Sequence, residues 1–171
     1  MRAAVMRAAV MRAAGGERVS GADGGAFTTA AEALAAVEAA LGFLASAQVA
    51  EWPADTLAGC LRALGRVESG QLAARSRVLT AFNAQAGFEA DGQASAKAWL
   101  RWQAQMTGAG SSGAMRWMRR LAVHPRVLAA LGAAEITSSF AWLICDCSDV
   151  LPPELRDEAD EISLFPGGRR S

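Results

Sequence analysis

The sequence predicts an all-α protein, because strong helix formers dominate the composition and apolar residues recur at helical intervals. Apolar residues make up 52% and charged residues 20% of the 171 positions, and alanine supplies much of the apolar share. No segment alternates apolar and polar residues in the manner of a half-buried strand. We therefore expect a long antiparallel helical hairpin packed with several shorter helices, and essentially no sheet.

Two long apolar segments near the start of the chain predict the hairpin. Thr29 and Glu32 have the spacing of a capping box, and leucine and valine then recur every three or four residues, which predicts a helix over about 30–50. Pro53 suits the first turn of a second helix, which is expected to end near Gly87. Leucines exposed along the seam of such a hairpin would favour dimerisation.

Shorter helices are predicted after a turn at residues 87–92. Ser95 is expected to cap the first of them, Gly108 to Gly110 to end it, and Ser111 or Ser112 to open the next. The three remaining helices are expected to begin at Pro125, at Thr137 or Ser138, and at Pro152-Pro153.

The chain is predicted to contain one domain between two flexible ends. Residues 1–28 open with a tandem MRAAV repeat and continue with a glycine-rich stretch, which predicts a flexible leader; residues 29–165 form the helical domain and residues 166–171 a flexible tail. No segment approaches the roughly eighteen uncharged apolar residues of a membrane span, so no membrane contact is expected. Three cysteines without a secretory signal predict a cytoplasmic location.

Charge is balanced over the chain but divided between its parts. Seventeen basic residues match seventeen acidic ones. The stretch 62–126 carries ten basic and three acidic residues, whereas the stretch 135–161 carries eight acidic residues and one arginine. The halves are therefore electrostatically opposed, although the whole chain generates no net attraction for nucleic acid.

No catalytic centre, cofactor site or metal site is predicted. His124 with Ser111 or Ser112 is the only nucleophile–base combination considered, and a lone histidine before a proline is more often a turn residue or a helix flank. Cys145 and Cys147 are separated by one residue rather than the two to four typical of zinc sites, so they are interpreted as buried or half-buried thiols. The five tryptophans are interpreted mainly as core residues rather than as stacking platforms for bases.

An arginine cluster is the one candidate binding site. Arg116 and Arg120 are one helical turn apart, Arg119 adjoins them and Arg126 follows after a short turn, so their guanidinium groups are suited to a phosphate backbone. The alternative is internal pairing, because the acidic helix expected over 154–161 offers carboxylates to the same arginines.

The order of these signals resembles a known family, the actinobacterial domain of unknown function found upstream of HNH endonuclease domains, including mycobacterial repeat proteins. The resemblance covers roughly residues 34–164. It rests on the following residues and segments in order: Leu61, Leu64 and Glu68; Gly92-Gln93-Ala94-Ser95 before Ala98-Trp99-Leu100; Met106-Thr107-Gly108 and Ala114; Pro125-Arg126-Val127-Leu128-Ala129-Ala130-Leu131-Gly132 before Ile136-Thr137; and Leu151-Pro152.

The resemblance implies a non-catalytic accessory domain that contacts DNA or a nuclease partner. Relatives often continue into a nuclease domain with a His-Asn-His constellation, which one histidine, His124, and one asparagine, Asn83, do not supply. We therefore expect no enzyme activity, and a stand-alone or truncated amino-terminal domain. The alternative expectation is a protein-interaction or homo-oligomerisation domain without a nucleic-acid role, or a remnant of a truncated gene.

Overall fold

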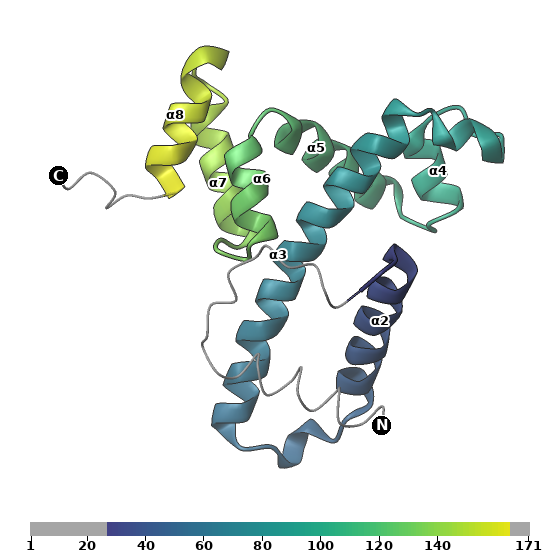
Figure 1. Cartoon of the computed structure of the whole chain (residues 1–171), viewed down its shortest axis with the longest axis vertical. Coiled ribbons are helices and arrows are strands. Elements are labelled where there is room, and N and C mark those ends of the chain that lie inside the picture. The colour runs from purple at the N-terminus through teal and green to yellow at the C-terminus, as the bar shows by residue number, and fades with distance from the viewer. Residues whose placement is uncertain (1–26, 165–171) are drawn as a thin grey trace. The chain divides into compact units, whose positions relative to one another are not determined.

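The computed structural model describes residues 27–164 and confirms the all-α fold class. Every regular element in this range is helical (Figure 1). The leader and tail expected at residues 1–28 and 166–171 lie almost wholly outside the described residues. The elements in chain order are α2 (Ala30–Ser46), the 3₁₀ helix η1 (Val49–Glu51), α3 (Ala54–Ala84), the 3₁₀ helix η2 (Gly87–Asp91), α4 (Ala96–Trp102), α5 (Gly108–Ala122), α6 (Pro125–Gly132), α7 (Ser138–Ser148) and α8 (Pro153–Leu164).

The chain divides into two compact units within α3, the first ending at Ala63 and the second beginning at Leu64. The single helical domain expected over residues 29–165 stays a prediction. In the first unit, the Thr29 hydroxyl accepts a hydrogen bond from the Glu32 amide at 3.2 Å and so caps α2 as predicted. The helix ends at Ser46 rather than near residue 50, because the chain passes into η1.

Helix α2 contributes no residue to the buried core. No residue of α2 is buried, although the helix itself forms as predicted. Helix propensity explains this difference, because an alanine-rich segment with a good N-cap becomes helical without help from tertiary contacts. The leucines and valine expected in the hairpin seam therefore lie largely exposed.

The second unit holds the core, in two apolar clusters. Helices α6 and α7 pack against α8, and α4 packs against α5. The side chains of α3 that contribute to the clusters come from its second half. The first cluster contains Leu72, Ala73, Leu121, Val127, Leu131, Ala141, Ile144 and Cys145, and the second contains Leu79, Ala96, Leu100, Ala114, Met115 and Met118.

The tryptophans border this core rather than filling it. Trp99 and Trp117 pack against the two clusters as half-buried residues, which agrees with the expected core role. Trp102 is 71% exposed, contrary to that expectation. It is the last residue of α4, where the helix has already passed the edge of the core.

Helix starts follow the predicted caps with one correction. Ser95 and Thr137 cap α4 and α7 by accepting hydrogen bonds from backbone amides, as expected. Helix α5 begins earlier than predicted: Gly108 is its first residue, and the Thr107 hydroxyl accepts from the Gly110 amide at 3.0 Å. The prediction that Ser111 or Ser112 opens this helix was wrong, because Thr107 already caps it by accepting from one free amide of the first turn, that of Gly110.

Candidate functional site

The predicted arginine cluster spans the end of α5 and the first turn of α6, in the second unit. Arg116 and Arg119 are exposed, whereas Arg120 is largely covered, with 14% of its side chain accessible. Arg126 is 43% accessible. The four side chains therefore differ in environment, and the contacts of each decide which of them is available to a phosphate.

Arg120 contacts two carboxylates and one aromatic ring. Its Nη2 atom lies 2.7 Å from Asp149 Oδ2 and 3.2 Å from Asp146 Oδ1, and its Nε donates to Asp149 Oδ2 at 2.9 Å. Its guanidinium carbon lies 4.0 Å from the centre of the Trp142 ring, a cation–π contact. Burial lowers the pKa of Arg120, but the hydrogen bonds to Asp149 and Asp146 outweigh burial and leave that pKa raised. The contacts of Arg120 therefore have a structural role, because they link α5 to α7.

Arg126 is held by the acidic helix α8. Its Nε donates to Asp157 Oδ2 at 2.9 Å, and its Nη2 lies 3.3 Å from Glu161 Oε2. The hydrogen bond to Asp157 is the main reason that the pKa of Arg126 is raised. The alternative of internal pairing is therefore confirmed for this arginine.

Arg116 and Arg119 differ from the other two. Neither forms an ion pair with a carboxylate among residues 27–164. The Arg116 guanidinium carbon lies 5.7 Å from the centre of the Trp142 ring, and Trp142 stacks edge-on against Trp117 with centroids 5.4 Å apart. The structure places all four arginines in one region but leaves only these two with unpaired charge.

A buried histidine network adjoins the cluster, and sequence reasoning missed it. His124 is fully buried, and its Nδ1 lies 2.7 Å from Oδ2 of Asp160, which is also fully buried. On the other side of the ring, His124 Nε2 lies 3.1 Å from Asp149 Oδ1. The His124 ring therefore links α8 to the end of α7, while Arg120 holds the other oxygen of Asp149.

Both nitrogens of the His124 ring face carboxylate oxygens. A neutral imidazole donates from one nitrogen only, so both contacts are hydrogen bonds when the ring is an imidazolium or when one carboxyl carries a proton. The second oxygen of Asp160 is buried without a hydrogen-bond partner, so His124 is the contact that offsets the cost of burying this carboxylate. The sequence interpretation of His124 as a turn residue or helix flank is right about its position before α6 but not about its role.

Asp149 is where the arginine cluster meets the histidine network. Burial raises the pKa of its carboxyl, but hydrogen bonds from His124 and Arg120 outweigh burial and hold that pKa below its usual range. The carboxylate is therefore the stable form in the folded protein, and it contacts both Arg120 of α5 and His124, the residue before α6.

The catalytic pairing considered from the sequence does not form. Both ring nitrogens of His124 are occupied by aspartates, and the hydroxyls of Ser111 and Ser112 donate to the carbonyl oxygen of Gly108 at 3.1 and 2.8 Å. A general base must reach the hydroxyl that it activates, and here it does not. The contacts of His124 instead link α8 to the end of α7.

The three cysteines differ in burial. Cys145 is buried, and burial raises the pKa of its thiol to about 12, so it stays protonated. Cys60 is half-buried, whereas Cys147 is exposed, contrary to the expectation of buried or half-buried thiols. In the part of the chain that the structure describes, no three potential ligands gather into a metal site.

The signal that the sequence analysis overlooked is an acid on the inward face of a helix. Asp160 is the only buried residue of α8, and Leu164, one turn later, packs against the first core cluster. A buried aspartate needs a hydrogen-bond partner, and His124 is the one histidine of the sequence. The pairing itself spans 36 residues, which no local pattern encodes.

No family model, curated protein or solved structure matches this chain. The resemblance to the domain that precedes HNH endonucleases therefore stays a prediction. Among the described residues, no helix combines the length and apolar character that crossing a bilayer requires.

Proposed function

We propose that this chain is a non-catalytic helical domain that self-associates through an apolar stripe on α2. The observation that carries the proposal is that no residue of α2 is buried. Leu34, Val37 and Leu41, which define the stripe, are 63%, 47% and 40% exposed. They recur at intervals of three and four, so they share one helix face.

Single exposed apolar groups are common on protein surfaces, but Leu34, Val37 and Leu41 are three neighbours on one helix face. Contiguous apolar surface of this kind marks interaction sites in proteins, because its burial against a partner removes it from water. A second copy is the simplest partner, since two-fold self-association is the commonest form of oligomer.

The stripe is tested by adding a charge to it. Leu41→Glu is expected to shift the protein towards monomer by at least about tenfold in the dimer dissociation constant, because the carboxylate must be desolvated in the interface. Sedimentation equilibrium over a wide concentration range measures the change. Ala39→Glu is the matched control: it adds the same charge about 160° around the helix, at about 100° per residue, and should leave association unchanged.

Equal effects of the two substitutions would show that charge, rather than its place on the stripe, governs association. A wild-type chain that remains monomeric at every concentration would contradict the proposal itself.

DNA contact is the second candidate, supported by the exposed and unpaired Arg116 and Arg119. It agrees with the family resemblance, in which such a domain acts beside a nuclease, and it assigns no role in DNA contact to Arg120 and Arg126. Titration of duplex DNA at low salt, repeated as salt rises, tests it. Replacing Arg116 and Arg119 with alanine should reduce the slope of log K against log salt by about two, whereas Arg126→Ala should leave it unchanged. Absence of binding by the folded protein at low salt would exclude this role.

A further inference from the structure

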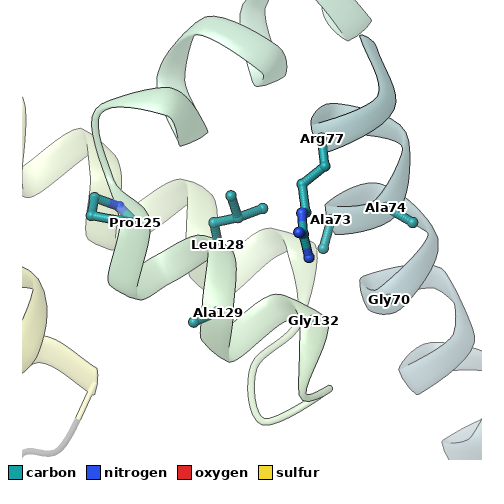
Figure 2. A pocket seen from close by; sticks show the side chains of 8 residues that line it. All are labelled: Gly70, Ala73, Ala74, Arg77, Pro125, Leu128, Ala129 and Gly132. Carbon is teal, nitrogen blue, oxygen red and sulfur yellow. The ribbon is translucent and has the colours of Figure 1, made fainter. Parts of the chain in front are cut away.

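A groove lies in the second unit, between the second half of α3 and helices α5 and α6. It consists of two adjoining hollows of about 500 and 410 Å³ that share Arg77, Pro125 and Leu128. Figure 2 shows the first hollow, with the α3 residues on one wall and the α6 residues on the other. The α3 wall of the two hollows runs from Gly70 to Ala84, and the opposite wall includes Met118, Leu121, Pro125 and Leu128.

The chemistry of the groove is apolar with a single charge. Small side chains on α3 leave room for a bulky group, and aliphatic groups on α5 and α6 supply the opposite wall. Arg77 is the only charged residue that lines either hollow, and it forms no ion pair with the described residues. In Figure 2 its guanidinium points into the space between the helices, beside Ala73 and facing Leu128. A matching ligand is thus apolar and carries one acid.

Helix α2 has this composition. Its charged residues are Glu32 and Glu38. Glu32 already accepts a hydrogen bond from the Thr28 amide in the N-terminal cap, at 2.9 Å. Glu38 lies about 40° from Leu34 around the helix, so it flanks the exposed stripe that Leu34, Val37 and Leu41 form. An apolar helix with one acid beside its stripe is complementary to an apolar groove with one arginine.

The lengths also agree. At about 1.5 Å per residue, the 17 residues of α2 span about 26 Å, and the groove wall from Gly70 to Ala84 spans about 23 Å. Helices that bind in grooves place residues at intervals of three and four against the floor, as the stripe of α2 does.

Chain length favours a second copy over the same chain as the source of this helix. Only Ala47 to Pro53 separate α2 from α3, so an α2 folded back antiparallel to its own α3 would run level with roughly residues 54–70, at equal rise per residue. The groove begins where that span ends. The MRAAV repeat and the C-terminal end are poor alternatives, since Arg2, Arg7 and Arg12 in the repeat and Arg169 and Arg170 in the tail have the same charge as Arg77.

We propose that α2 of one copy binds in the groove of a second copy, with Glu38 paired to Arg77 and the stripe against the apolar walls. This deepens the proposed self-association and rests on it. The same exchange in the opposite direction closes a two-fold dimer, in which each copy gives one helix and receives one.

Charge exchange in the full-length chain tests the proposal. Arg77→Glu places two acids together and Glu38→Arg places two cations together, so each variant alone should weaken dimerisation about ten- to a hundredfold. A mixture of the two variants has complementary pairs in both grooves of the mixed dimer, and should restore association to within about threefold of wild type. Sedimentation equilibrium measures all three samples, and circular dichroism confirms that each variant is folded.

The outcomes separate the two proposals. Restoration in the mixture supports helix exchange between copies, whereas a mixture as weak as its components overturns it. Single variants that dimerise like wild type overturn the groove while leaving self-association through α2 in place. A wild-type chain that is monomeric throughout overturns both.

Discussion

Replacing His124 with alanine is expected to lower the free energy of unfolding by about 3–5 kcal/mol, the range for removing one partner of a buried charged pair. His124 is the only hydrogen-bond partner of Asp160 among the described residues, and both side chains are fully buried. Without the ring, the Asp160 carboxyl group is left buried with no hydrogen-bond partner among the described residues. Chemical denaturation at neutral pH measures the loss.

A double variant separates the charge from the packing. His124→Ala with Asp160→Ala leaves no uncompensated charge, so we expect it to be more stable than His124→Ala alone despite the larger cavity. A loss below about 1 kcal/mol in the single variant, or a double variant whose loss is the sum of both single losses, would contradict the role assigned to this pair.

Replacing Leu131 with alanine is expected to cost about 2–5 kcal/mol, the range for truncating a buried leucine. Leu131 lies fully buried in the first core cluster, with Val127 from the same helix and Ile144 from α7. Its loss leaves a cavity that the surrounding helices fill only in part. The change is measured as a shift of the denaturation midpoint at constant m-value.

Leu155→Ala in α8 is the matched control, because the same atoms are removed from a side chain that is 48% exposed. It should cost less than about 1 kcal/mol, in line with substitutions on the surface. Equal losses at the two positions would show that the core is not where the structure places it.

The charge network and the apolar core of the second unit involve neighbouring helices. Helix α8 contributes the Asp160 contact and the ion pairs to Arg126, and α6 carries the core residue Leu131. Arg120 and Asp149 connect the same region to α7. The second unit is thus stabilised by apolar packing and by a network of paired charges, and the exposed stripe of α2 takes no part in either.

This division explains why self-association, the first of the proposed functions, is placed away from the charge network. Arg120 and Arg126 already form ion pairs with carboxylates of this unit, so they are not available to a DNA phosphate. Self-association through α2 requires no change in the buried network, because the apolar stripe and Arg77 are exposed. The experiments on Leu41 and Arg77 therefore act on the surface, whereas those on His124 and Leu131 act on stability.

Local sequence determined the helices of this protein. Thr29, Ser95 and Thr137 each satisfy free amides at a helix start, and Pro125 begins α6, because capping and backbone restriction act within one turn. The cap of α5 is equally local, because the Thr107 hydroxyl accepts a hydrogen bond from the amide of Gly110, three residues later. Thr107 could therefore have been predicted as this cap from the sequence.

Only the tertiary structure decided which charges meet and which apolar faces stay open. Asp160 and His124 lie 36 residues apart, and Arg120 and Asp149 lie 29 apart, so their pairing depends on how α5, α6, α7 and α8 pack. The periodicity of α2 indicates an apolar face but is the same whether that face is covered or exposed. Burial is a property of neighbours in space, and a pattern within one helix does not contain it.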